Sequence, residues 1–109
     1  MTMLKDSGKR VHFKSGMNRD TNVGKPRYDL VNEEMLTRWA ILMMKGAEKY
    51  GERNWELANS PEEADRFKAS AWRHFVSWSR GDIDEDHAAA VFFNIAAFER
   101  TVKKLLEGR

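Results

Sequence analysis

Four carboxylates crowd into one short segment of this 109-residue chain. The segment GDIDED contains Asp82, Asp84, Glu85 and Asp86. Neighbouring carboxylates repel one another unless a cation or a basic group neutralises them. Oxygen ligands on a short turn suit Mg²⁺ or Mn²⁺, and Mg²⁺ in particular keeps several waters and shares a substrate phosphate. The alternative needs no metal, because acidic side chains are also favourable just before the N-terminus of a helix.

Polar side chains near this segment could face a pocket. His87 and Asn94 are seven residues apart, which places them on one strip of a helix, with the small Ala90 between them. In the preceding helical segment, His74 falls on the same face as the apolar residues Phe67, Ala71 and Trp78, so it is also expected to point inward. Buried imidazole and amide groups need hydrogen-bond partners. These side chains therefore form either a satisfied core network or the wall of a catalytic pocket.

The stretch GAEKYGERNW ends a helical pattern and then places an arginine, an amide and an indole side by side. Lys45, Lys49 and the arginine put positive charge near the helix end. Asn54 could read a base edge, and Trp55 could stack on a base. In the alternative, Tyr50 and Trp55 close the core and the cations are solvated.

Positive charge is concentrated at the N-terminus. Residues 1–27 carry seven Lys/Arg and two Asp/Glu, a net of +5, whereas the remainder carries 12 and 15, a net of −3. A basic arm on a mildly acidic body favours contact with the phosphates of a nucleic acid or nucleotide, although a solvated tail is the alternative. The absence of cysteine favours a reducing compartment, here the cytoplasm, and no apolar run is long enough to span a membrane.

Three helical segments would position these residues. Apolar spacings of three and four predict a helix over residues 31–50, with Asn32 as its N-cap. The sequence SPEE, which begins at Ser60, is a capping box with proline at the first helical position and predicts a helix up to about residue 80. A third helix is expected over residues 85–106.

The helix pattern predicts an all-α fold of three long helices in a bundle. The expected domains are a basic, loop-like or extended arm over residues 1–23 and an all-α domain over residues 24–109. Three helices bury a limited core, so a homo-oligomer, a dimer or a tetramer, is expected. The expected apolar face of the second helix is Phe67, Ala71, Phe75 and Trp78, and the expected apolar stripe of the third is Ala88, Val91, Phe92, Ile95, Phe98, Val102, Leu105 and Leu106. Dimerisation is expected through the Trp- and Phe-rich faces.

Four sequence blocks, in order, resemble the phage and bacterial dATP/dGTP diphosphohydrolase family. They are GKPRYDL, GAEKYGERNW, AWRHFVSWSRGDIDEDH and the helix in which Asn94 follows His87 by seven residues. That family is similar to the MazG-like all-α nucleotide pyrophosphatases. The resemblance covers about residues 24–100 and leaves residues 1–23 outside.

The resemblance implies cleavage of a purine deoxynucleoside triphosphate to the monophosphate and pyrophosphate, with Mg²⁺ or Mn²⁺ as cofactor. It implies a cytoplasmic protein, of the bacterial host where a phage encodes it. As catalytic groups, the resemblance implies His74, His87 and Asn94. As nucleotide-binding groups, it implies Lys25, Arg27, Lys49, Tyr50, Asn54, Trp55 and Arg73, and the charge near the first helix's end adds Arg53. As metal ligands, it implies Asp82, Asp84 and Asp86, and Glu34 is added from the first helix.

The chain differs from the MazG-like pattern in one respect. Those enzymes carry paired acids on two helices, whereas the second helix here offers Trp72-Arg73-His74. The carboxylates for a metal would then come from the acidic turn, with Glu34 or Glu48 from the first helix. Two alternatives follow: a non-catalytic protein that sequesters a nucleotide on the same scaffold, and an interaction protein whose basic arm contacts nucleic acid or a host factor.

Overall fold

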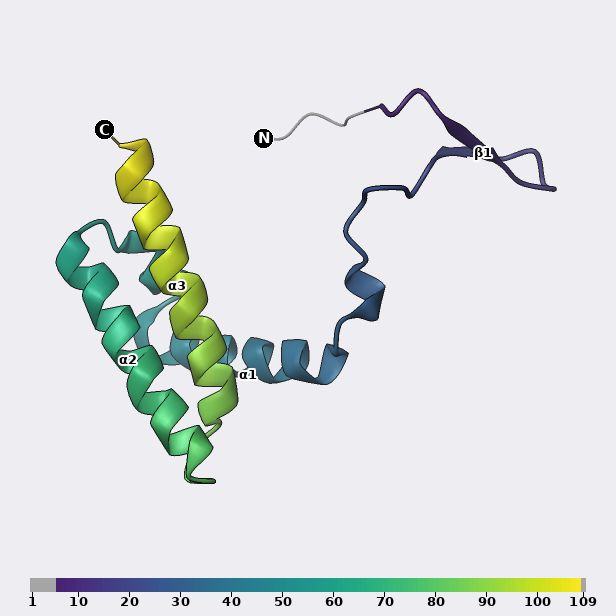
Figure 1. Cartoon of the computed structure of the whole chain (residues 1–109). Helices are drawn as coiled ribbons and strands as arrows, with labels where there is room; N and C mark the ends of the chain where they lie inside the picture. Colours follow the sequence, from purple (N-terminus) through teal and green to yellow (C-terminus); the bar gives the residue numbers. More distant parts are fainter. Residues whose placement is uncertain (1–5, 109) are drawn as a thin grey trace. The chain divides into compact units, whose positions relative to one another are not determined.

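The computed structural model describes residues 6–108 of the chain, which divide into two compact units. The first unit ends at Val31 and the second begins at Asn32 (Figure 1). This junction lies later in the chain than the boundary expected at residues 23 and 24. Each unit has its own internal contacts, and the functional residues of the three helices all belong to the second unit.

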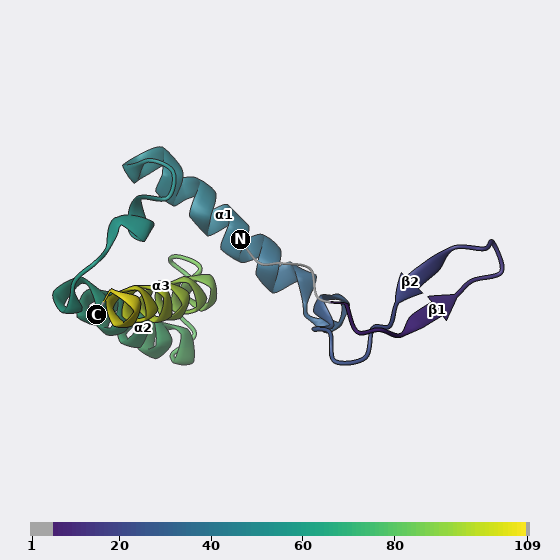
Figure 2. The same ribbon diagram turned by 90° about the horizontal axis from the view of Figure 1, so that it is seen from above.

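The N-terminal unit contains a short antiparallel hairpin. Strand β1 (Arg10–His12) pairs with β2 (Asn18–Asp20) in a register that places Val11 opposite Arg19 (Figure 2). A single 3₁₀ turn, η1 (Tyr28–Leu30), precedes the second unit. The basic segment, expected to be loop-like or extended, therefore contains one short pair of extended strands.

Helix α1 (Glu33–Tyr50) begins and ends where the sequence indicates. The Asn32 side chain accepts a hydrogen bond of 2.9 Å from the backbone N–H of Glu34, which confirms the predicted N-cap. At the other end Gly51 has φ 95°, a conformation that glycine adopts without strain, and its N–H donates to the carbonyl of Ala47 at 2.8 Å.

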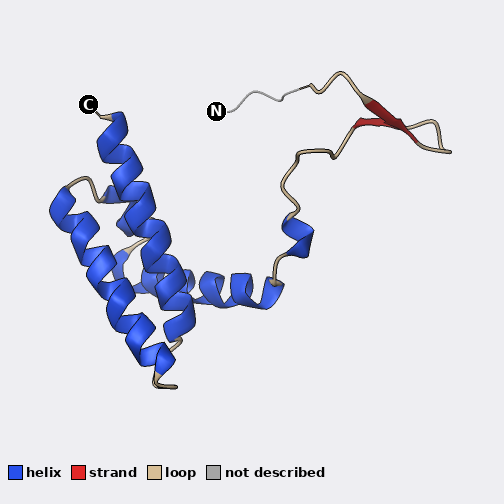
Figure 3. Ribbon diagram, in the orientation of Figure 1, coloured by secondary structure: helices blue, strands red, loops and turns tan. Residues whose placement is uncertain are grey.

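Helices α2 (Pro61–Ser79) and α3 (His87–Glu107) lie side by side and antiparallel (Figure 3). The capping box predicted at the start of α2 is present, because Ser60 Oγ accepts from the Glu63 N–H at 3.2 Å. Glu63 Oε1 in turn accepts from the N–H of Asn59 at 3.0 Å. A second 3₁₀ segment, η2 (Asn54–Leu57), connects α1 to this pair.

The most buried strip of α3 is small and polar rather than large and apolar. Its members are His87, Ala90, Asn94, Ala97 and Thr101, with Ala89 fully buried beside them. Two helices can approach closely only where the side chains between them are small. Parts of the expected apolar face of α2 and of the expected apolar stripe of α3 are uncovered in one chain: Phe92 and Ile95 on α3, and Phe75 and Trp78 on α2, are all between 43% and 54% exposed.

Helix α1 runs across the α2–α3 pair and packs mainly on α3 (Figure 1). Its Trp39 meets Phe92 edge to face at 5.1 Å, yet no residue of α1 is buried. The all-α class with three long helices is confirmed. Within residues 6–108, every helix is too short or too polar to cross a bilayer.

Candidate functional site

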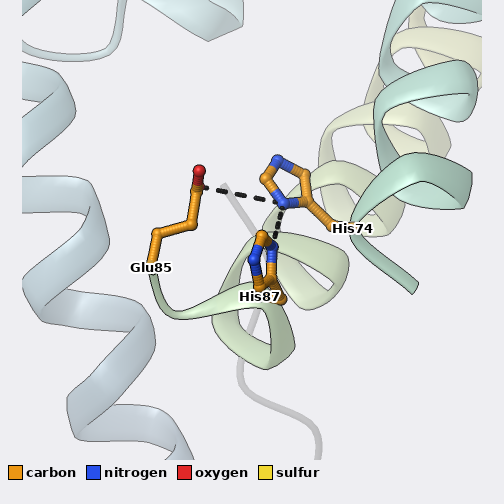
Figure 4. A group of neighbouring side chains, drawn as sticks. All are labelled: His74, Glu85 and His87. Carbon is orange, nitrogen blue, oxygen red and sulfur yellow. Dashed lines mark hydrogen bonds and ion pairs between the residues drawn. The ribbon is translucent and has the colours of Figure 1, made fainter. Parts of the chain in front are cut away.

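Two histidines from different helices face each other near the acidic turn. Nδ1 of His74, on α2, lies 2.9 Å from Nδ1 of His87, the first residue of α3 (Figure 4). The carboxylate of Glu85 reaches the same place, with Oε1 3.8 Å from His74 Nδ1. One ligand atom from each residue lies within 4.8 Å of the other two. We call these three residues the His–Glu cluster.

Asp84 fixes the orientation of one imidazole in this cluster. Its Oδ1 lies 2.7 Å from Nε2 of His87, whose side chain is only 6% exposed. This hydrogen bond is the main reason that the pKa of Asp84 lies below its ordinary value. A carboxylate at Nε2 favours the tautomer with its proton there, which leaves the lone pair of Nδ1 directed at His74.

Asp86 has two structural roles, an ion pair and a helix cap. It accepts two hydrogen bonds from the guanidinium of Arg38, at 2.6 and 2.8 Å, and also caps α3 by accepting from the N–H of Ala89 at 3.0 Å. The Arg38 bonds lower the pKa of Asp86 to about 2, and the Ala89 bond adds to the effect. The capping alternative thus describes this carboxylate well.

The structure does not gather the expected carboxylate ligands into a metal site. Asp82 pairs with Arg80 at 2.8 Å, and Glu34 lies in the exposed first turn of α1. Among residues 6–108, three ligand groups come within reach of one ion only in the His–Glu cluster. Two imidazoles and one carboxylate differ from the all-oxygen set that Mg²⁺ prefers. The residues present therefore do not fit a Mg²⁺ site on the acidic turn.

A pocket of about 750 Å³ lies between the C-terminal half of α1, the η2 segment and the start of α2. We call it the basic pocket. Five of the residues expected to bind nucleotide line it, namely Lys49, Tyr50, Arg53, Asn54 and Trp55. Its apolar walls include Leu42, Met43, Phe67 and Phe93. The structure thus brings together most of the expected nucleotide-binding residues of the second unit.

The lining of this pocket is strongly cationic. Lys45, Lys49, Arg53 and Arg66 outnumber the single carboxylate, Glu63. Glu63 accepts hydrogen bonds from the backbone N–H of Asn59 and the hydroxyl of Ser60, which lower its pKa and keep it negatively charged. Arg53 also pairs with Glu56 at 2.9 Å, so Lys45, Lys49 and Arg66 carry most of the positive charge that an anionic ligand would meet.

Two aromatic rings at the pocket already contact other side chains of the protein. Trp55 is half-buried, meets Phe93 edge to face at 5.7 Å and has the guanidinium of Arg100 5.6 Å from its ring centre. Tyr50 is 62% exposed, with the Lys49 ammonium 5.1 Å from its ring centre. The sequence offered Trp55 either as a ring that closes the core or as a ring that stacks on a base. Its position allows both roles, since it packs on Phe93 and also lines the pocket.

Asn94 and Arg73 are not among the residues that line the basic pocket. Asn94 is buried and its amide donates to the carbonyl of Ala90 at 2.8 Å, an arrangement typical of a satisfied core side chain. Arg73 is exposed on α2, next to His74 in the chain, and does not line the basic pocket.

Lys25 and Arg27 belong to the N-terminal unit. Lys25 lies 3.8 Å from Asp20, and Arg27 makes a two-point pair with Asp29 at 2.8 and 2.7 Å. Their role in phosphate binding stays a prediction.

The sequence reasoning missed three residues. Arg66 lines the basic pocket, Arg38 holds Asp86, and Glu85 completes the His–Glu cluster. Glu85 was visible only as one carboxylate among four. Arg38 and Arg66 carry no local signal, because each acts on parts of the chain that lie outside its own helix.

Comparison with known families identifies the chain. Residues 15–106 match the family described as dATP/dGTP diphosphohydrolase, N-terminal, and this range includes all four sequence blocks. The match begins within the hairpin, so the expectation that residues 1–23 lie outside the family was wrong for residues 15–23. Comparisons with curated proteins and with solved structures gave no match. The chain belongs to the dATP/dGTP diphosphohydrolase, N-terminal, family.

Proposed function

We propose that the protein hydrolyses purine deoxynucleoside triphosphates to the monophosphate and pyrophosphate. Two facts support this proposal: membership of a family described by dATP and dGTP, and a pocket in which cations surround an apolar and aromatic interior. The pocket carries the proposal, since such a lining suits a ligand with one flat apolar end and one polyanionic end.

The reaction needs charge neutralisation above all. A bond forms between a water oxygen and the α-phosphorus while the bond from that phosphorus to the bridging oxygen breaks, and pyrophosphate leaves. Lys45, Lys49 and Arg66 would offset the negative charge of the triphosphate and of the leaving group. A bound divalent cation would supply further neutralisation.

Single alanine variants of the pocket cations test this assignment. Arg66→Ala and Lys49→Ala should each raise the KM for dATP and dGTP about tenfold or more, because a charge-assisted hydrogen bond contributes about 1.5 kcal/mol or more. Lys103→Ala is the matched control, since Lys103 is an exposed cation on α3 outside the pocket. Equal KM values in all three variants would remove the basic pocket from the function.

A second candidate is nucleotide sequestration without cleavage in the same pocket. It is favoured by one observation, that the expected carboxylate ligands are dispersed. Calorimetry that shows tight binding of dATP or dGTP, with the nucleotide recovered intact, would support this candidate over hydrolysis.

A further inference from the structure

The His–Glu cluster has the arrangement of a transition-metal site. A first-row ion binds imidazole nitrogen and carboxylate oxygen at about 2.0–2.2 Å, so ligand atoms on one ion lie about 3 Å apart. The nitrogens of His74 and His87 are 2.9 Å apart, and the Glu85 oxygen lies 3.8 Å from the first of them. The ligand atoms of Glu85 and His87 also lie within 4.8 Å of each other, so all three groups are close enough to bind one ion.

A second observation supports a metal at this place. His87 is more than nine-tenths buried, and its outer nitrogen is held by Asp84 at 2.7 Å. A carboxylate behind a ligating histidine fixes the tautomer and aims the other nitrogen at the ion. Without an ion, that aimed nitrogen faces another imidazole nitrogen, and a single proton must lie between the two.

We propose that His74, His87 and Glu85 bind one divalent transition-metal ion, such as Zn²⁺ or Co²⁺, in preference to Mg²⁺. Two imidazoles make the donor set too nitrogen-rich for Mg²⁺, which takes oxygen ligands. Asp86 is unavailable as a fourth ligand because Arg38 holds both of its oxygens. Three protein ligands leave coordination positions open for water or for a substrate oxygen.

The site is separate from the basic pocket in space. His74 lies seven residues beyond Phe67, a wall residue of the pocket, which is about 10 Å along α2. Metal binding can therefore be measured without nucleotide. A failure of metal binding would leave the basic pocket and its proposed ligand untouched, and a failure of hydrolysis would leave the metal site standing.

Equilibrium dialysis of the chelator-treated full chain against Zn²⁺, followed by elemental analysis, tests the proposal. We expect one Zn²⁺ per chain, retained in millimolar Mg²⁺. His74→Ala should abolish binding, whereas His12→Ala, which alters the third histidine of the chain and lies in the N-terminal hairpin, should keep it. Loss of Zn²⁺ from the wild type in Mg²⁺, or equal binding by His74→Ala, would overturn the proposal.

Glu85→Gln keeps the proposal testable if the histidine variants unfold. Glu85 is 56% exposed, so its amide should leave the helical circular dichroism unchanged. We expect a loss of Zn²⁺ affinity of at least tenfold from Glu85→Gln. Asp84→Asn, which acts only through His87, should lower affinity by about 10- to 100-fold. With Co²⁺ as the probe, the visible spectrum should change in both variants. Wild-type affinity and spectrum in Glu85→Gln would contradict a His–His–Glu site.

Discussion

At the scale of single residues, Asp86 links two helices and starts one of them. Its carboxylate receives the Arg38 guanidinium from α1 and the Ala89 N–H of α3 at the same time. The sequence indicated the second role, because an aspartate before a helix is a familiar cap. It could not indicate the first, since the arginine lies 48 positions away. Local caps can be read from neighbouring residues, whereas long-range ion pairs depend on how the helices pack.

We expect Asp86→Asn to destabilise the fold in a pH-dependent way. Asparagine keeps the cap but loses the charge that pairs with Arg38, and since the two side chains are 33% and 38% exposed the loss should be about 1 kcal/mol after screening. The folded pKa of Asp86, about 2, lies below the unfolded value of about 3.9. The stabilisation is therefore complete above about pH 4 and is lost as the pH falls toward 2.

Urea unfolding of wild type and Asp86→Asn between pH 7 and pH 2 checks this expectation. The free energies of unfolding should differ most near neutral pH and converge at the acid end. Asp82→Asn, which breaks only the exposed pair with Arg80, is the matched control and should change stability little. A difference in unfolding free energy that stays constant with pH would show that the negative charge of Asp86 does not stabilise the fold.

Arg53 combines backbone strain with a position at the basic pocket. Its φ of 59° lies in the left-handed region, which costs a non-glycine residue about 1 kcal/mol. We predict that Arg53→Gly is more stable than Arg53→Ala by about that amount, while both lose the same affinity for nucleotide because both lose the cation. Thermal unfolding and calorimetry with dATP measure the two quantities. Equal stability of the two variants would show that the backbone relaxes at this position.

At the scale of elements, the α2–α3 pair depends on small side chains. Ala89 and Ala97 have no exposed surface, and the strip around them contains alanine, asparagine and threonine. Hydrophobic periodicity correctly predicted the three helices, because apolar spacings of three and four residues indicate an amphipathic helix. It did not identify the packed face, because α3 also carries a larger apolar stripe whose members Phe92 and Ile95 are half exposed. The packed face of α3 can be told from its exposed apolar stripe only when the close approach of α2 is known.

Ala97→Leu should therefore destabilise the protein by about 1–3 kcal/mol or more, since the added atoms have no space between the helices. Ala69→Leu introduces the same side chain at an exposed position of α2 and should change stability little. Urea unfolding monitored by circular dichroism at the helix band compares the two. Equal stability would mean that the α2–α3 contact is looser than the burial of Ala97 indicates.

At the scale of the whole molecule, the second unit leaves much apolar surface uncovered. A groove of about 340 Å³ between α2 and α3 is lined by Trp72, Phe75, Ile95 and Phe98 among others. Exposed apolar surface of this kind is typical of association between protein chains. The homo-oligomer expected from the limited core remains a prediction, and this groove is where we expect a second copy to pack.

Ile95→Glu should dissociate such an oligomer, because it places a charge in an apolar interface. Leu36→Glu on α1, where the side chain is 58% exposed, is the matched control for a new surface charge. Light scattering after gel filtration should give a smaller mass for Ile95→Glu alone. An unchanged mass in both variants would place the interface elsewhere or show that the chain is a monomer.

The most direct test of the proposed function is chromatography of the products formed from dATP and dGTP by the purified protein with Mn²⁺. The proposed reaction predicts the deoxynucleoside monophosphate and pyrophosphate in equal amounts. Release of inorganic phosphate with a diphosphate, or recovery of both nucleotides intact, would contradict it.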